Sequence, residues 1–109
     1  MTKKRSHPFR PRFHKSKKVN SGHPTYVFAK KKTKYSYLGL THSNRTNGVE
    51  NEPLKKNPNP NDTSKAYFRP VIEEASKSDI GRAQQGWSFC EEDKKKVSKF
   101  IRHQKNKRH

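Results

Sequence analysis

Acidic residues are missing from both ends of this sequence. The first twenty residues contain eight Lys or Arg and no Asp or Glu, and the sixteen residues from Lys94 onward again contain eight and none. All nine acids lie between residues 21 and 93, so the net charge of +18 comes almost entirely from the two ends. Like charges at this density repel one another, and only an external polyanion neutralises them well. The two ends therefore predict a polyanionic partner, with nucleic acid as the favoured one.

Long apolar runs and paired cysteines are also absent. No apolar stretch approaches the roughly 18 residues of a membrane span, and no apolar segment follows the N-terminal charges as in a signal peptide. Cys90 is the single cysteine, which excludes an intramolecular disulfide and suits a reducing cytoplasm. The six His and this Cys show none of the spacings of a metal site. We therefore expect a cytoplasmic protein without metal or other cofactor that does not enter a membrane.

Hydrophobic residues are few but concentrated. They make up 26% of the 109 residues, which leaves room for one small domain and no second core. Most of them lie between the two basic ends. We expect a disordered basic arm over residues 1–20, a small β-rich body over residues 21–93, and a basic C-terminal helix and tail over residues 94–109.

Two neighbouring strand signals give the clearest structural prediction. Residues 25–28 are rich in β-branched and aromatic side chains, and residues 35–41 place their tyrosines on one face and their leucines on the other. The charged segment Lys30–Lys34 lies between them as a turn. Two strands joined by a short polar connection predict a β-hairpin.

The rest of the chain gives weaker signals. Asn47-Gly48 is a strong turn dipeptide, and residues 49–54 are compatible with a short strand. The alternating prolines of residues 57–62 exclude regular structure there. Residues 66–69 form another expected strand, whereas residues 73–85 are weakly patterned and are expected to form a loop with at most a short helical turn.

The C-terminal part is expected to form a helix over residues 89–102. Ser88 and Glu91 have the spacing of a capping box, acidic residues follow in the first turn, and basic residues stand near the end. Val97 begins an apolar stripe that would pack on a sheet. Several short strands with one C-terminal helix predict a mainly β fold, either a small SH3-like barrel or a curled antiparallel sheet, flanked by the basic arms.

The densest set of reactive side chains follows the second expected strand. His42 can move a proton as a general base or acid, while Arg45 has a planar fork suited to a phosphate or to the charge of a phosphoryl transition state. Thr41 and Ser43 can donate hydrogen bonds to the same oxygens. If the hairpin forms, His23 lies near Thr41, and the two histidines could form a general acid–base pair. RNA cleavage by its own 2′-OH needs only such groups.

The same features also allow structural explanations. Thr-His-Ser-Asn is ordinary turn composition, and basic ends are typical of solubilising or targeting tails, or of attraction to an anionic membrane surface. Nucleic acid is favoured because phosphate contacts at even half of the charges would release many counterions. Aromatic residues on neighbouring strands could stack on unpaired bases, although core packing is the favoured use of Tyr26, Tyr35, Tyr37, Tyr67 and Phe68. The candidate nucleic-acid contacts are Lys3, Lys4, Arg5, Arg10, Arg12, Lys15, Lys17, Lys18, Lys30, Lys31, Lys32, Lys34 and Arg69.

Two short motifs give a loose resemblance to a known family. The segments Gly22-His23-Pro24-Thr25-Tyr26-Val27 and Leu38-Gly39-Leu40-Thr41-His42-Ser43 resemble the first core strand and the RNA-site strand of the MazF/PemK-like toxin ribonucleases. The resemblance covers about a third of the chain, from His23 to Leu54. It implies an SH3-like barrel with helices and toxin–antitoxin function, with an antitoxin or a second copy of the chain as partner. The chain departs from the family where Lys30–Lys32 replace a catalytic Arg, a role that only Arg45 could take over.

Two main functional hypotheses follow. The first is a small cytoplasmic RNA-directed protein, a toxin-like endoribonuclease that needs no metal and gathers its substrate with the basic arms. The second is an RNA- or DNA-binding protein without catalysis, of ribosome-associated, phage or mobile-element type. An inhibitor of an acidic protein surface is a third and less favoured class. Phosphate contacts carry no sequence information, so composition does not separate these hypotheses.

Overall fold

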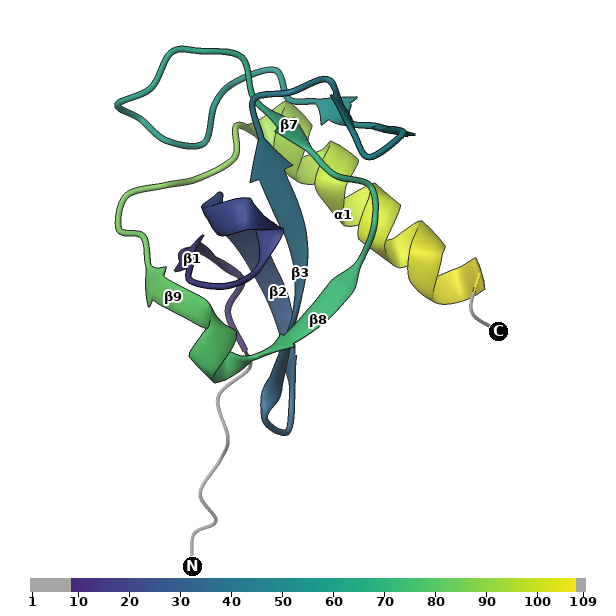
Figure 1. The fold of residues 1–109 in the computed structure, drawn as a ribbon. Helices are drawn as coiled ribbons and strands as arrows, with labels where there is room; N and C mark the ends of the chain where they lie inside the picture. The colour runs from purple at the N-terminus through teal and green to yellow at the C-terminus, as the bar shows by residue number, and fades with distance from the viewer. Residues whose placement is uncertain (1–8, 108–109) are drawn as a thin grey trace, which may run out of the picture.

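The computed structural model describes residues 9–107, which form a mainly β protein ending in a long helix (Figure 1). The elements in chain order are β1 (Arg12–Ser16), the 3-10 turn η1 (Asn20–Gly22), β2 (Thr25–Lys31), β3 (Lys34–Thr41), β4 (Arg45–Thr46), β5 (Val49–Glu50), β6 (Glu52–Pro53), β7 (Tyr67–Phe68), β8 (Glu73–Ser76), the 3-10 turn η2 (Lys77–Asp79), β9 (Ile80–Ala83) and α1 (Glu91–Lys107). The long polar connection from β3 to β7 holds only the shortest strands. It forms one end of the molecule, at the top of Figure 1.

The main sheet is antiparallel and curls around β3. Its order is β6-β7-β3-β2-β1-β9, and β8 also pairs with β3. The first half of β3 pairs with β8 and its last two residues pair with β7, so one long strand serves two successive partners along the same edge. This arrangement confirms the predicted mainly β class. Over the described residues the sheet is curled and is not closed into a barrel.

The β2–β3 hairpin joins the two stretches that the sequence predicts as strands. The expected charged turn over residues 30–34 is shorter in the structure and contains only Lys32 and Thr33, because the residues on either side already pair. Lys32 has a φ of 52°, in the left-handed region that tight turns use. A register shift just after Val27 marks a β-bulge, which increases the local twist and helps the sheet to curl.

Both faces of β3 are buried, and each contributes to a different core. The main core consists of Phe13, Leu38, Leu40, Leu54, Ala66, Phe68 and Val97, the last of which comes from α1. The smaller core on the other face consists of Val27, Tyr37, Ala75 and Ile80. The leucines and tyrosines of β3 therefore separate between two faces as their alternation predicts. The segment that carries His42 leaves a strand that is fixed on both sides.

Strand β1 corrects the predicted N-terminal arm. Residues 12–16 pair with both β2 and β9, although we expected residues 1–20 to be disordered. Phe13 explains the difference: it is only 5% exposed, and its ring centroid lies 4.9 Å from that of Phe89 and 5.0 Å from that of Tyr26. One aromatic side chain in a basic stretch thus anchors the strand to the main core.

The C-terminal third differs from the prediction in two places. Residues 73–83, expected as a loop, contain β8 and β9 joined by η2. Helix α1 begins at Glu91 and not at residue 89, so Ser88 does not occupy the N-cap position, and its backbone N–H donates to Pro58 O instead. Asp93 in the first turn is 2% exposed and accepts the backbone N–H groups of Lys55 and Lys56 at 2.8 and 3.0 Å. The helix is thereby tied to the polar connection above the sheet.

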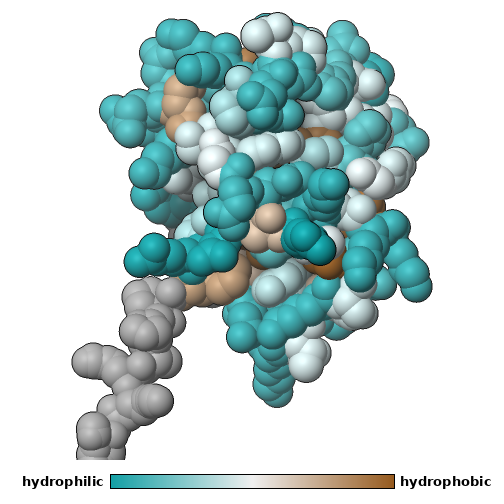
Figure 2. All heavy atoms as spheres, turned by 90° about the vertical axis from the view of Figure 1, so that its left-hand side faces the viewer, coloured by the Kyte–Doolittle hydropathy of each residue, from teal (hydrophilic) through white to brown (hydrophobic). Residues whose placement is uncertain are grey.

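The face of the molecule drawn in Figure 2 is predominantly hydrophilic. Figure 2 shows the side that carries β9 and β1, where apolar atoms form only small patches between polar side chains. No helix in the described part of the chain combines the length and the apolar character needed to cross a membrane.

Candidate nucleic-acid interface

Three of the predicted site residues line one cavity at the end of the hairpin. His23, which precedes β2, and Thr41 and His42, at the end of β3, surround a space of about 180 Å³. The opposite wall comes from the polar connection and includes Asp62, while Trp87 contributes an apolar side. The hairpin brings the two histidines together because it pairs the start of β2 with the end of β3.

Asn20 fixes the backbone around His23. Its side-chain amide donates to Pro24 O at 2.8 Å and to Leu40 O at 3.0 Å, with a longer contact of 3.3 Å to His23 O. Pro24 O also accepts the backbone N–H of Leu40 at 3.0 Å. The Asn20 side chain lies directly against Gly39, where a side chain would collide with it. One amide therefore holds the segment before β2 against the end of β3, which positions His23 at the cavity.

Asp62 orients the imidazole of His42. The Nε2 atom of His42 lies 3.1 Å from Oδ2 of Asp62, which accepts two further bonds through Oδ1, from Ser64 Oγ at 2.6 Å and Ser64 N at 2.9 Å. The bonds from Ser64, and then that from His42, lower the pKa of Asp62 to about 2. The carboxylate is therefore ionised at neutral pH and can only accept hydrogen bonds. It follows that Nε2 carries a proton and that Nδ1 of neutral His42 is the free base.

The loop that carries Asp62 is ordered by its own side chains. Asn57 Oδ1 accepts the N–H of Asn59 and Asn59 Oδ1 accepts the N–H of Asn61, both at 2.9 Å. Asn57 also donates through Nδ2 to Ser64 O at 3.1 Å, which closes the loop. These side chain–backbone bonds replace the regular pairing that the alternating prolines prevent. An irregular loop, as predicted, can therefore hold Asp62 in place.

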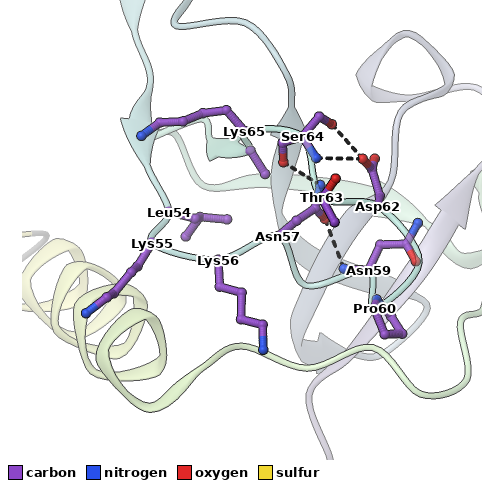
Figure 3. Close-up of a pocket in the computed structure, with 11 residues that line it drawn as sticks. Leu54, Lys55, Lys56, Asn57, Asn59, Pro60, Asp62, Thr63, Ser64 and Lys65 are labelled. Atoms are coloured by element: carbon purple, nitrogen blue, oxygen red, sulfur yellow. Dashed lines mark hydrogen bonds between the residues drawn. The ribbon is translucent and has the colours of Figure 1, made fainter.

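A second hollow of about 400 Å³ lies along the same loop (Figure 3). The two spaces share the lining residues Asn57, Asn59, Asp62 and Ala66. Lys55, Lys56 and Lys65 stand around the second hollow and are exposed. Lys55 forms an ion pair with Glu92, which raises its pKa, whereas Lys56 and Lys65 form none among the described residues. The two hollows therefore adjoin at this loop, with histidines lining one and lysines lining the other, and we refer to them together as the groove.

Ser43 and Arg45 lie apart from this groove. Neither lines the cavity of the two histidines. Ser43 donates its backbone N–H to Thr41 Oγ1 at 3.1 Å, and Arg45 donates through Nη1 to Gly48 O at 3.3 Å within the β4–β5 hairpin. The structure therefore separates the five predicted catalytic residues into three that share a cavity and two, Ser43 and Arg45, that do not line it.

Arg69 is partly buried and is paired with Glu73. Its Nη1 donates to Glu73 Oε2 at 3.0 Å, and Tyr37 donates its hydroxyl to Glu73 Oε1 at 2.9 Å. Burial and this bond raise the pKa of Tyr37. The Nε atom of Arg69 is buried and has no hydrogen-bond partner among the described residues. This network connects β3, β7 and β8, and the prediction of Arg69 as a phosphate contact gains no support from it.

The other predicted phosphate contacts lie on the surface where the structure describes them. Lys30, Lys31, Lys32 and Lys34 are exposed at the tip of the β2–β3 hairpin, at the opposite end from His23 and Thr41. The exposed residues near β1 are Arg10, Arg12, Lys15, Lys17 and Lys18. Lys3, Lys4 and Arg5 lie outside the described residues. Basic side chains thus occur at both ends of the hairpin.

No family model, curated protein or solved structure matches this chain. Among the side chains that the structure describes, no group of three His, Cys, Asp or Glu comes together as metal ligands. The functional interpretation therefore depends on the geometry of the groove alone.

Sequence reasoning missed Asp62 and the three lysines of the groove. Asp62 lies 20 residues from its partner His42. The run of asparagines and prolines before it signals an ordered loop, but no local pattern indicates where that loop folds back. Lys55, Lys56 and Lys65 form no dense run, so their clustering appears only in three dimensions.

Proposed function

We propose that this protein binds single-stranded RNA in the groove between the end of β3 and the loop that carries Asp62, and that it cleaves RNA there. The observation that carries the proposal is the shared cavity of His23 and the His42–Asp62 pair, which adjoins a hollow surrounded by lysines. A base, an acid and nearby cations are the groups that RNA transesterification requires.

The reaction is a transfer within the RNA strand. Nδ1 of His42 takes the proton of the 2′-OH, and the 2′ oxygen attacks the adjacent phosphorus to form a 2′,3′-cyclic phosphate. The bond from phosphorus to the 5′ oxygen breaks, and protonated His23 donates a proton to that leaving oxygen. Asp62 keeps His42 in the tautomer with Nδ1 free, since it holds the proton on Nε2.

Lysines and Thr41 stabilise the negative charge of the phosphate. Lys56 and Lys65 neutralise the strand where it leaves the cavity, and the Thr41 hydroxyl, which accepts from Ser43 N, remains free to donate to a phosphate oxygen. DNA can occupy the same groove, but it lacks the 2′-OH that attacks. The proposal therefore predicts cleavage of RNA and only binding of single-stranded DNA.

The decisive experiment follows end-labelled single-stranded RNA with the purified protein in EDTA. We expect discrete cuts that end in a cyclic phosphate, with the rate lowered about 10²- to 10⁴-fold by His42→Ala. His103→Ala removes an exposed histidine of α1 outside the cavity and serves as the matched control. An RNA with a single deoxynucleotide at the cut site should resist cleavage there. Equal cleavage by wild type and His42→Ala would overturn the assignment of the base.

A binding protein without catalysis is the second candidate, and one observation favours it. Arg45, the guanidinium that could stabilise the transition state, does not line the cavity and is bonded to Gly48 O. Lysine lacks the bidentate fork of arginine. In the same assay this function would give a retarded but intact RNA whose affinity falls with salt.

The cellular setting is also a proposal. Cytoplasmic RNA is the expected target, and the single Cys90 suits that reducing compartment. The resemblance of residues 23–54 to MazF/PemK-like toxins favours a toxin of a bacterial, phage or mobile-element system. Growth arrest on expression of wild type but not of His42→Ala would support a toxin, and an unchanged growth rate would oppose it.

A further inference from the structure

Three rings gather on the outer part of β1 and β3, away from the groove. The centroid of Tyr35 lies 5.6 Å from that of His14 and 6.1 Å from that of Phe9. Phe9 is the exposed large hydrophobic residue of the described chain, with 38% of its surface accessible. His14 is held in place by a 3.0 Å hydrogen bond from its ring Nδ1 to Gly81 O. His14 and Tyr35 are partly buried, and Tyr35 also packs against the smaller core, so the exposed Phe9 is the outermost ring of the cluster.

Cations surround this aromatic cluster. Lys77 Nζ lies 5.8 Å from the centroid of Tyr35, in a cation–π contact. The backbone N–H of Lys77 donates to Thr33 O at 3.3 Å, so η2 is attached to the tip of the β2–β3 hairpin. That tip carries four more exposed lysines, Lys30, Lys31, Lys32 and Lys34. Lys30 pairs in register with Tyr35 and lies on the same face of the sheet, whereas Lys31 and Lys34 lie on the opposite face. Arg10 and Arg12, on either side of residue 11, are exposed as well.

Acidic residues do not neutralise these cations. None of the five lysines forms an ion pair among the residues that the structure describes. Glu74 pairs in register with Ser36, and its side chain is therefore on the sheet face opposite to Tyr35. The other acids of this region are Asp79, at the end of η2, and Glu73, which is bonded to Arg69 and Tyr37. Basic residues therefore outnumber acidic ones around the rings, and an anionic partner with flat faces fits this surface best.

We propose that Phe9, Tyr35 and His14 form a second binding surface, on which unpaired bases of RNA stack while the surrounding lysines contact its phosphates. The inference rests on the proposed RNA-binding function and extends it to a site at the far end of the hairpin. Aromatic rings bind bases of any sequence, and lysines bind the backbone without regard to sequence. The surface therefore holds a strand without selecting its sequence, while the groove carries the chemistry.

The test separates stacking from charge. We would measure the affinity of the full chain, with His42→Ala present to prevent cleavage, for a short oligouridylate and for an abasic strand of the same length. Phe9→Ala should weaken binding of oligouridylate about tenfold. It should leave the abasic strand unaffected, because that strand offers only phosphates. Phe9→Tyr keeps a ring at this exposed position and should restore the affinity.

A charge variant completes the design. Replacing Lys30, Lys31 and Lys32 together with Gln should weaken the binding of both strands. The slope of log affinity against log salt concentration should fall in magnitude by about two, since each single-strand phosphate contact contributes roughly 0.7. If Phe9→Ala changed the affinities for the two strands equally, or changed neither, the proposed stacking surface would be refuted. If Phe9→Ala leaves both affinities unchanged while the chain with His42 intact still cleaves RNA, this inference is refuted and the proposed function stands. Absence of any RNA binding would refute both.

Discussion

A single methyl group at residue 39 would test how the end of the β2–β3 hairpin is held. In Gly39→Ala, the new Cβ would lie 2.5 Å from Oδ1 and 2.8 Å from Cγ of Asn20, well inside van der Waals contact. The Asn20 side chain must therefore move. It would then lose its hydrogen bonds to Pro24 O and Leu40 O, which are 2.8 and 3.0 Å long.

The loss of stability in Gly39→Ala can be calculated from these two hydrogen bonds. At about 1 kcal/mol for each hydrogen bond, their loss lowers the free energy of unfolding by about 2 kcal/mol. Alanine restricts the unfolded chain and returns roughly 0.5 kcal/mol, because Gly39 does not need the left-handed region. The net loss is about 1.5 kcal/mol, equivalent to a decrease of roughly 6 °C in Tm for a domain of this size.

A double-mutant cycle identifies the cause. Asn20 has a φ of 52°, so Asn20→Gly removes the side chain without backbone strain. In that background no bonds are lost and only the effect on the unfolded chain remains, so Gly39→Ala should stabilise by roughly 0.5 kcal/mol. The coupling energy between the two positions is then about 2 kcal/mol. Urea unfolding followed by Trp87 fluorescence and circular dichroism measures all four proteins. Additive costs, or a cost of Gly39→Ala below about 0.5 kcal/mol in the wild-type background, would refute the reasoning.

Three further predictions concern stability. Phe13→Ala should lower the free energy of unfolding by about 3 to 4 kcal/mol in urea titrations, because the ring is 5% exposed in the main core; a cost below about 1 kcal/mol would mean that β1 is not anchored. Asp93→Ala should lower the free energy of unfolding by about 3 kcal/mol in the same assay, since two backbone N–H groups lose a buried carboxylate acceptor. Glu91→Ala, which removes an exposed acid of the same helical turn, is the control. Tyr37 has a pKa raised above its ordinary 10.0, so the unfolded chain loses this proton first and stability should fall as pH rises past 10.0. In Tyr37→Phe this part of the alkaline decrease should be absent from unfolding midpoints measured across that range.

Local pattern was sufficient for the parts of the fold that depend on neighbouring residues. The alternation in residues 35–41 predicts both the strand and the division of its side chains between two cores. Asn47 and Gly48 have φ values of 49° and 78°, the pair that a tight β4–β5 turn requires. Strand alternation and turn preference both depend on residues a few positions apart, so each can be read from the sequence alone.

Long-range pairing explains what could not be predicted. β1 and β9 pair although 67 residues separate His14 from its hydrogen-bond partner Gly81, and a lysine-rich sequence around a single buried Phe13 gives a weak strand signal. The partnership of His42 with Asp62 depends on a loop folded by its own asparagine side chains. The proximity of His23 and Thr41 was predictable, because His23 comes just before the first strand of the hairpin and Thr41 ends the second.

The position of Asp62 bears on the choice between cleavage and binding alone. A carboxylate whose pKa is about 2 stays ionised in a groove with Lys56 and Lys65, and it repels the phosphates that the groove would hold. For a protein that only binds RNA this charge is a disadvantage, whereas for catalysis it keeps Nδ1 of His42 free. Asp62→Asn should therefore have opposite effects under the proposed function: tighter RNA binding, because a negative charge is removed, and slower cleavage, because the tautomer is no longer fixed. A variant that binds more weakly and cleaves unchanged would show that Asp62 serves only to order the loop.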